Sequence, residues 1–174
     1  GPAPPCPGGA VLKAVARASL GLAPAPTLEW ATAPAALSPW LPLLALPLGE
    51  QAPARLKGLL RHHWARYQVS LQQLRQIREQ TEAPCMLLDD LALAGQYYPA
   101  PATRTLEGLD LYLARGAADL LKARLLQSDW QIPPWPDPAG FQELRQRDGT
   151  RLRLHHHWLP LAPQPDPAGL WERA

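Results

Sequence analysis

Cysteine is scarce in this sequence, because its 174 residues include only Cys6 and Cys85. Cys6 lies in a proline-rich segment, and Cys85 begins an apolar run that is typical of a buried strand, so we expect no structural disulfide between them. The pattern favours a reducing compartment, and it predicts a cytoplasmic protein.

Long apolar runs are missing as well. Pro39, Pro42 and Pro47 interrupt the most apolar stretch of the chain. No segment therefore reaches the roughly 20 consecutive apolar residues that a membrane-spanning helix requires. The sequence thus predicts no membrane insertion.

An excess of one charge is also absent. The chain has 17 Lys and Arg against 15 Asp and Glu, which gives a formal net charge of +2. The two signs are mixed along the sequence, and no basic stripe of the kind that neutralises phosphate backbones is present. We therefore expect no binding to nucleic acid.

Signatures of several enzyme classes are lacking. No glycine-rich phosphate loop lies between a strand and a helix, there is no Cys-x-x-Cys pair, and no serine stands in a nucleophile-elbow context. A serine or cysteine hydrolase is therefore disfavoured.

Proline is abundant, with 22 residues of which eleven fall in the first 53. They divide that part into a predicted helix over residues 10–20 and short helical turns at 27–30 and 41–48. Gly1-Pro2 resembles the scar left by removal of an expression tag, so residues 1–9 are interpreted as a tail that contains it.

The clearest helix is predicted over residues 53–82. Its apolar residues follow spacings of three and four, which predicts one buried face; they are Leu56, Leu59, Leu60, Trp64, Tyr67, Leu71, Leu74 and Ile77. His62 and His63 point about 100° apart on a helix, so they cannot form a facing pair, and we expect a solvated or capping role for them.

Strand and helix patterns alternate after residue 84. The run Cys85 to Leu88 predicts a buried strand, and Asp89-Asp90 suits the start of a helix that ends at Tyr98. The further predicted elements are a strand at 109–113, a helix at 117–128 with Leu120, Leu121, Leu125 and Leu126 on its apolar side, a strand at 130–132, a strand or short helix at 141–147, a turn at Asp148-Gly149 and a strand at 151–159. This order predicts an α/β fold with a small mixed sheet behind a helical N-terminal region.

Four spaced motifs carry a family resemblance: the stretch from Leu87 to Ala94, the pair Tyr98-Pro99, the stretch from Arg104 to Leu111, and the histidine-rich stretch that ends in Trp158. They resemble, in order and spacing, a large bacterial family of uncharacterised nucleotidyltransferases. In that family a helical region precedes a minimal polymerase-beta-like domain. The resemblance covers residues 10–160 and implies a helical region at 10–83, a nucleotidyltransferase-like domain at 84–161 and a proline-rich tail at 162–174.

The departures from the family pattern fall on its chemistry. Asp89-Asp90 replaces a Lys-Gly pair near the phosphates, and Gly108 replaces the first of two metal-binding carboxylates. His155 replaces a third acidic residue when His157-Trp158 is matched to the family's His-Trp. Of the carboxylates, Asp110 alone remains, and Arg104 stays as a phosphate contact or as a residue that positions the loop.

The resemblance therefore implies a degenerate nucleotidyltransferase that is more pseudoenzyme than enzyme. Two-metal phosphoryl chemistry needs several carboxylates around the metal ions. We expect weak or absent nucleotide binding, no cofactor, and a regulatory or accessory role through a protein partner.

In two alternative interpretations the protein binds a metal ion. In the first, Glu107, Asp89 or Asp90 replaces the lost ligand and leaves an active magnesium-dependent enzyme. Glu107 would need a bulge for this, because adjacent residues of a strand point to opposite faces. In the second, His155 and His157 on one strand face bind zinc or iron together with Asp110 on a neighbouring strand. The competing interpretation is that one histidine packs in the sheet and the others face solvent.

The tryptophans offer a basis for partner binding. Most of the seven stand beside prolines or chain breaks, where an exposed aromatic side chain can anchor a partner; these are Trp30, Trp40, Trp130, Trp135, Trp158 and Trp171. For Trp64 and Trp158 we expect core packing in place of partner contact.

Overall fold

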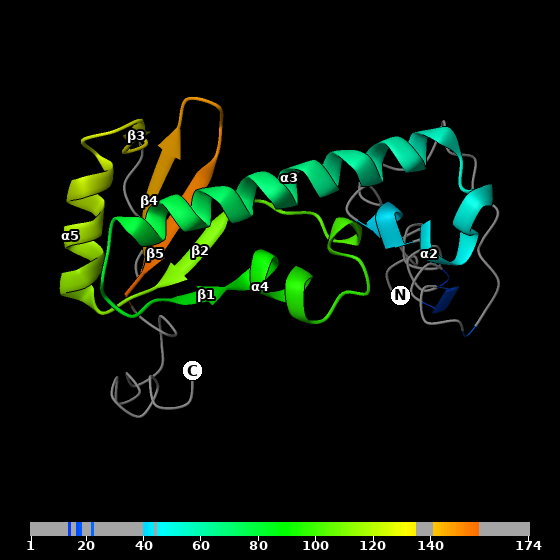
Figure 1. Cartoon of the computed structure of the whole chain (residues 1–174), viewed down its shortest axis with the longest axis horizontal. Coiled ribbons are helices and arrows are strands. Elements are labelled where there is room, and N and C mark those ends of the chain that lie inside the picture. Colours follow the sequence, from blue (N-terminus) through cyan, green and yellow to red (C-terminus); the bar gives the residue numbers. More distant parts are fainter. Residues whose placement is uncertain are drawn as a thin grey trace, which may run out of the picture. The chain divides into compact units, whose positions relative to one another are not determined.

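The computed structural model describes residues 14, 17, 18, 22, 40–43, 45–134 and 141–156. These residues form helices and one five-stranded mixed sheet, which confirms the predicted α/β fold class (Figure 1). They group into two compact units: unit 1 lies within residues 1–67 and 94–106, and unit 2 lies within residues 68–93 and 107–174. No described helix is both long and apolar enough to cross a membrane.

Helix α3 (Ala54–Glu79) is the long helix that the sequence predicts, and it begins directly after Pro53. Its most buried positions are seven residues apart, at Leu56, His63, Ser70 and Ile77. This stripe is narrower than the predicted apolar face, and Trp64 lies about 100° away from it. Trp64 is 56% exposed, so its expected core role is wrong.

The two adjacent histidines of α3 differ in burial. His63 is buried, whereas His62 faces solvent. The expectation that both are solvated or capping is therefore wrong for His63. Burial lowers the pKa of His63 below its ordinary value, and the neighbouring His62 and Arg66 lower it further.

Unit 1 has a small aliphatic core. Its buried members are small or branched apolar residues, namely Ala18, Leu41, Ala45, Ala52 and Leu56, with Leu43, Leu48, Leu59 and Leu60 packed around them. Helix α2 (Ala45–Leu48) and the 3₁₀ turn η2 (Gly49–Gln51) confirm the helical turns predicted near residues 41–48. Residues 14, 17 and 18 are helical, while the rest of the predicted helix at 10–20 and the turn at 27–30 lie outside the described residues.

Unit 2 is built on the sheet, whose strands lie in the order β1-β2-β5-β4-β3. The strands β2 and β5 are parallel and the other pairs are antiparallel. Their bounds are β1 (Met86–Leu88), β2 (Leu109–Tyr112), β3 (Trp130–Gln131), β4 (Phe141–Gln146) and β5 (Arg151–His155). The last strand of the described chain is thus the central strand of the sheet.

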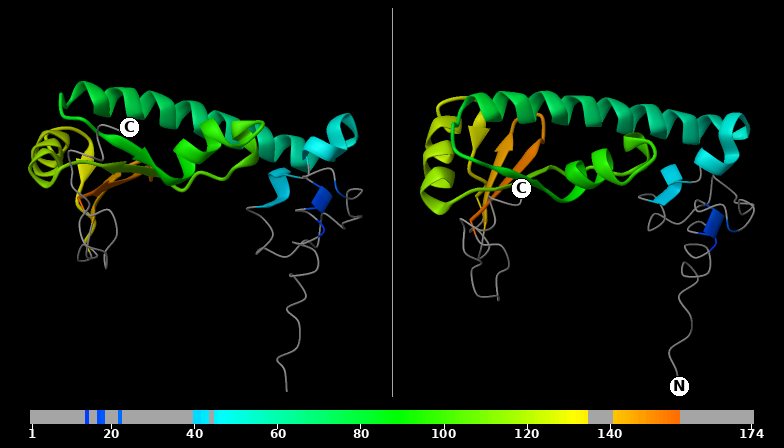
Figure 2. Two further views of the ribbon diagram at one scale, coloured as in Figure 1. Left: turned by 90° about the horizontal axis from the view of Figure 1, so that it is seen from below. Right: turned by 60° about the horizontal axis from the view of Figure 1, so that its bottom comes forward.

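One face of the sheet is apolar and carries the core of unit 2. Its leucines are at most 1% exposed, and they are Leu109, Leu111, Leu144, Leu152 and Leu154. The end of α3 and helix α5 (Arg115–Leu125) bond to this face, because Gln73 donates to Gln146 and Gln142 donates to Asp119. Figure 2 shows the C-terminal part of α3, which belongs to unit 2, along one side of the sheet.

Helix α5 begins two residues before its predicted start, and its buried side is narrower than predicted. Ala118, Leu121 and Leu125 are buried at spacings of three and four. Leu120 is 66% exposed and Leu126 is 38% exposed, so their expected places on the apolar side are wrong. The reason is that Leu120 lies one residue, or about 100°, from Leu121.

The chain reverses sharply between β4 and β5. Gly149 has a φ of +86° and donates from its backbone N–H to the Gln146 carbonyl at 3.0 Å. This confirms the predicted turn at Asp148-Gly149, since glycine adopts that conformation without steric cost. It also makes the segment at 141–147 a strand, which the sequence left open.

The helix predicted after β1 is α4 (Asp89–Gln96). Its first residue, Asp89, has a φ of +53°, which is uncommon outside glycine but tolerated by Asp and Asn. A 3₁₀ turn, η3 (Pro101–Thr103), follows in the loop toward β2, and the Thr103 hydroxyl donates to the Ala100 carbonyl at 2.7 Å.

Candidate functional site

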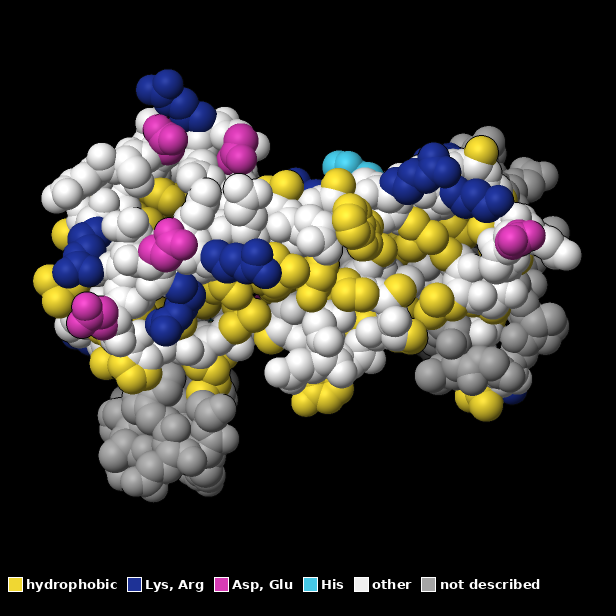
Figure 3. Space-filling view, viewed as in Figure 1, with side chains coloured by type: hydrophobic (Ala, Val, Ile, Leu, Met, Phe, Trp, Pro, Cys, Tyr) yellow, Lys and Arg dark blue, Asp and Glu magenta, His cyan; other side chains and the backbone are white. Residues whose placement is uncertain are grey.

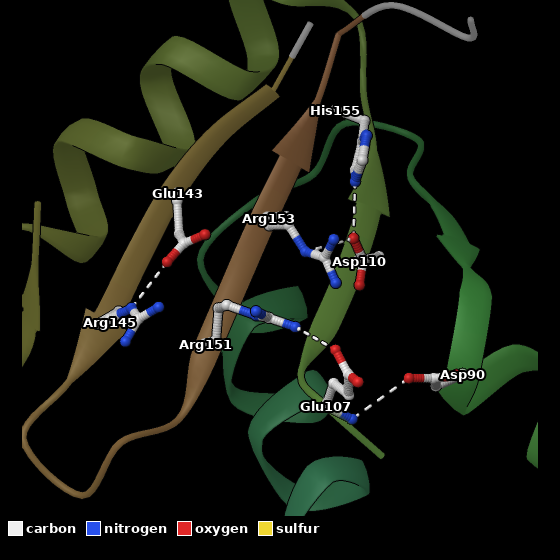
Figure 4. A network of polar contacts seen from close by, with 8 residues as sticks. All are labelled: Asp90, Glu107, Asp110, Glu143, Arg145, Arg151, Arg153 and His155. Carbon is white, nitrogen blue, oxygen red and sulfur yellow. Dashed lines mark hydrogen bonds and ion pairs between the residues drawn. The ribbon is translucent and has the colours of Figure 1, made fainter. Parts of the chain in front are cut away.

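Asp110 of β2 lies on the second face of the sheet, and its side chain is only 5% exposed. Its Oδ1 atom lies 2.7 Å from Nε2 of His155 and 3.0 Å from Nε of Arg153 (Figure 4). Both partners come from β5, the neighbouring parallel strand. The structure thus brings together two predicted site residues, Asp110 and His155, with a third that was not predicted.

Strand alternation produces this arrangement. In β2 and β5 apolar residues alternate with polar ones, and alternate residues of a strand point to opposite faces. The parallel register sets Asp110 opposite Arg153 and Tyr112 opposite His155. We call the resulting surface the polar face; its residues are Asp110, Tyr112, Phe141, Glu143, Arg145, Arg151, Arg153 and His155.

Phe141 of β4 supports the two partners of Asp110. Its ring centroid lies 5.2 Å from that of His155, and the guanidinium carbon of Arg153 lies 5.8 Å from it. The aromatic ring therefore limits the freedom of both side chains. Arg153 and His155 are held against Asp110 from a second direction.

The charge of Asp110 is compensated within the fold. Arginine stays protonated at any ordinary pH, so the guanidinium of Arg153 is a permanent cation beside this buried carboxylate. His155 occupies a hydrogen-bonding position on the same oxygen. Oδ1 is therefore already in contact with two protein groups.

The other carboxylates of the polar face are also paired. Glu143 accepts from Arg145 at 2.7 Å, and Arg151 donates to Glu107 at 3.1 Å. Arginines therefore stand beside acids along β4 and β5, as Figure 4 shows. Together with the Asp110–Arg153 pair, these contacts set three cations against three anions on the polar face and at its edge.

The predicted substitute ligands are engaged elsewhere. Glu107 has a side chain that is 69% exposed and paired with Arg151. The Oδ2 atom of Asp90 accepts from the backbone N–H of Glu107 at 3.3 Å, and Asp89 is exposed. Across the described ranges, no three His, Cys, Asp or Glu residues are placed to hold a metal ion together. His157, the remaining predicted metal ligand, lies outside the described residues.

The backbone at Gly108, the position matched to the first metal-binding carboxylate of the resembled family, lies close to β5. A Cβ atom built at this position would lie 2.7 Å from the backbone carbonyl oxygen of Arg151 and 3.2 Å from its Cβ. Since real Cβ atoms essentially never approach other atoms so closely, β5 leaves no room here for any side chain. An aspartate at this position would require the backbone of β5 to move.

These residues do not fit a magnesium site. Magnesium prefers near-octahedral oxygen ligands and is held by one or two free carboxylates together with phosphate oxygens. At Asp110 a guanidinium and an imidazole ring stand where the ion would lie, and the guanidinium repels a cation. No step of metal-assisted chemistry follows from this geometry.

Arg104 lies in unit 1 and has a local partner. Its Nη1 donates to the Tyr98 hydroxyl at 2.8 Å, and its guanidinium lies 5.3 Å from the centroid of the same ring. Of its two predicted roles, loop positioning accounts for both contacts.

Arg153 is the residue that sequence reasoning missed. Matching His157-Trp158 to the family pattern directed attention to His155 as the replaced acid, whereas the structural register puts Arg153 directly opposite Asp110. The alternation Arg-Leu-Arg-Leu-His in β5 contained the signal. It could be used only with the knowledge that β5 pairs with β2 in parallel.

The tryptophans divide into two groups. Trp40 is 46% exposed, in agreement with a surface position, whereas Trp130 is 5% exposed and belongs to the core of unit 2. The predicted anchors Trp30, Trp135 and Trp171 lie outside the described residues, as does Trp158, for which core packing was expected.

No protein-family profile, curated protein or solved structure matches this chain. The nucleotidyltransferase resemblance therefore depends on the order and spacing of the sequence motifs.

Proposed function

We propose that this chain is a catalytically inactive nucleotidyltransferase-like protein that acts through protein contacts as a regulatory or accessory subunit. The observation that carries the proposal is the neutralisation of Asp110. This carboxylate is buried; Arg153 forms an ion pair with one of its oxygens at 3.0 Å, and His155 shares a hydrogen bond with the same oxygen at 2.7 Å. The group that resembles the last metal ligand of the family thus serves to join two strands.

The surroundings of Asp110 support the same conclusion. The position of the partner carboxylate is Gly108, where an added Cβ atom would lie 2.7 Å from the Arg151 carbonyl oxygen of β5. The nearest candidate substitute, Glu107, is paired with Arg151. Restoring a metal site would require at least two side-chain changes and a shift of β5, so we propose a loss of activity that the fold has accommodated.

Exposed aromatic side chains support the second half of the proposal. Trp64 is 56% exposed and Tyr97 is 74% exposed, both in unit 1. Trp and Tyr are enriched among the residues that dominate binding energy in protein interfaces. Trp64 stands on a helix whose fold does not need it buried, so its apolar surface is available to a partner.

Thermal unfolding with nucleotides tests the loss of activity. A ligand present at 100 times its Kd stabilises the folded state by about 2.7 kcal/mol, which is roughly 5 to 11 °C in Tm for a chain of this size. We expect less than about 1 °C from magnesium-ATP or magnesium-CTP at millimolar concentration. A magnesium-dependent rise that Asp110→Asn abolishes would overturn the proposal.

The contact surface is tested with Trp64→Ser. We expect this variant to keep its Tm and to lose a stoichiometric partner that co-purifies with the wild-type chain, because the replaced side chain is mostly exposed. Gln68→Ala, one helical turn further along α3 and also exposed, is the matched control and should retain the partner. Equal retention by both variants would remove Trp64 from the contact surface.

A further inference from the structure

Unit 2 contains a cleft between the end of α3 and the end of α5, with a volume of about 360 Å³. Side-chain amides dominate its lining, with Gln73, Gln76, Gln80, Gln127 and Gln146 over a floor of Ile77, Leu125 and Trp130. We call it the amide cleft. It adjoins the apolar face of the sheet, on which Gln146 lies, and Asp110 lies on the polar face.

We propose that the amide cleft binds a segment of a partner protein in extended conformation, through hydrogen bonds to its backbone. This inference rests on the proposed function, because it assigns a place to the protein contact proposed there. A primary amide presents a donor and an acceptor side by side. The backbone of an extended chain presents the complementary carbonyl and N–H groups at regular intervals.

The spacing on α3 matches an extended chain. Gln73, Gln76 and Gln80 are three and four residues apart, so they lie on one face of the helix. With a rise of about 1.5 Å per residue, Gln76 and Gln80 are displaced by about 6 Å along the axis. Backbone groups on the same side of an extended chain recur about every 6.6 to 6.8 Å. Each of the two amides therefore reaches successive backbone groups of one segment.

Of the three glutamine side chains on this face of α3, the first is hydrogen-bonded within the protein and, among the described residues, the other two are not. The side-chain amide of Gln73 donates to Gln146 Oε1 at 3.1 Å and to Thr150 Oγ1 at 2.9 Å. Within the part of the chain that the structure describes, the side-chain amides of Gln76, Gln80 and Gln127 bond to no other residue. The fixed amide closes the cleft toward the β4–β5 turn, and the remaining amides meet a ligand without breaking internal bonds.

The charges of the amide cleft favour a neutral ligand. Its lining has one cation, Arg124, and one anion, Asp129. Nη1 of Arg124 donates to the backbone carbonyl of Gln80 at 2.6 Å, which occupies part of the guanidinium. Figure 3 shows charges of both signs interspersed over the one face of unit 2 that it presents. A phosphate or other anion finds no cluster of cations here.

The floor of the amide cleft distinguishes a peptide from a sugar. Sugar sites use the exposed face of an aromatic ring as a platform, whereas Trp130 is only 5% exposed. Ile77, Leu125 and Trp130 form an apolar floor on which one side chain of a peptide can rest. The volume lies within the roughly 300 to 1,000 Å³ that is usual for ligand pockets, so it holds a short segment and not a whole helix.

The test selects a ligand and then asks where it binds. A phage-displayed random dodecapeptide library is panned on the full chain, and the enriched peptide is synthesised for calorimetry. We expect the double variant Gln76→Ala/Gln80→Ala to weaken its binding by about 10- to 100-fold, because two hydrogen bonds are lost. Gln72→Ala, an exposed glutamine of α3 outside the cleft lining, should change the affinity less than about twofold.

Three outcomes overturn the inference: no enriched peptide, equal affinity of the double variant and the wild-type chain, or binding of a neutral oligosaccharide that the double variant abolishes. Circular dichroism confirms that the double variant is folded, as expected for two exposed glutamines. The magnesium-nucleotide test concerns Asp110 on the other face of the sheet. Failure of the panning therefore overturns only the inference about the amide cleft. A magnesium-dependent shift in Tm overturns only the proposal that the protein is catalytically inactive.

Discussion

Replacing Arg153 with methionine gives the most direct measure of the polar face. The variant Arg153→Met keeps an apolar stem beside Phe141 and removes the permanent cation next to Asp110. Asp110 then remains a buried carboxylate with His155 as its neighbour. The fold must either keep that charge with less compensation or admit water.

The magnitude follows from the exposure of the pair. Breaking a fully buried ion pair costs about 3 to 5 kcal/mol, and exposed pairs contribute about 0.2 to 1 kcal/mol. The side chains of Arg153 and Asp110 are 21% and 5% exposed, and His155 still bonds to the carboxylate. We therefore expect a loss of about 2 kcal/mol in the free energy of unfolding, which is roughly 4 to 8 °C in Tm.

A double-mutant cycle measured by urea unfolding separates the ion pair from side-chain packing. Asp110→Asn should cost about 1 kcal/mol, because Arg153 can turn toward water. The double variant Asp110→Asn/Arg153→Met contains no uncompensated buried charge. Its loss in the free energy of unfolding should therefore be about 1 to 2 kcal/mol smaller than the sum of the two single losses. A single Arg153→Met within about 0.5 kcal/mol of the wild-type chain, or an additive double variant, would refute this account of the site.

Two further predictions concern the fit of β5 and the burial of a histidine. Gly108→Ala should destabilise the chain by about 2 kcal/mol, because its Cβ would meet the Arg151 carbonyl. Gly58→Ala on α3, with nothing within 4 Å of the new Cβ, should stabilise it by about 0.5 to 1 kcal/mol; equal effects in urea titrations would contradict the close approach at β5. The lowered pKa of His63 implies that its neutral form favours folding, fully above the unfolded value near 6.5, and that this contribution is lost as pH falls through the lowered folded pKa. The free energy of unfolding should therefore fall between pH 7 and pH 5, and this fall should be smaller in His63→Gln. His62→Gln removes only one of the lesser causes of the lowered pKa, so its pH dependence should stay closer to that of the wild-type chain. The same pH dependence in all three proteins would show that His63 is not the group responsible.

Much of the fold was predictable because local patterns are strong where they are regular. The long α3, the strand at β2 and the glycine turn before β5 each follow from periodicity or turn chemistry over a few residues. Errors arose where a pattern depended on which side of a helix was buried. Trp64 and Leu120 were assigned to buried faces by their apolar character, but each lies one residue from the position that packs.

The candidate site was predictable only in part, for a different reason. Asp110 and His155 could be chosen from residue type and spacing, and the structure places them 2.7 Å apart. The role of Arg153 depends on the parallel register of β2 and β5, two strands that are remote in sequence. The closure at Gly108 depends on the position of the Arg151 backbone, which no side-chain pattern encodes.

The central place of β5 has a consequence for how unit 2 folds. The pair β1–β2 and the hairpin β4–β5 can each form from neighbouring segments, but the sheet is complete only when β5 docks on β2. His155 and Asp110 are 45 residues apart in sequence, so this step pays a loop-closure entropy before its contacts form, and such non-local pairing is slow. Until then β2 presents an open, leucine-rich edge, which is the kind of surface that pairs with other chains. Synthesis that stops before Arg151 would leave that edge uncovered, and the truncated product should aggregate, whereas the chain extended through His155 can close its own sheet.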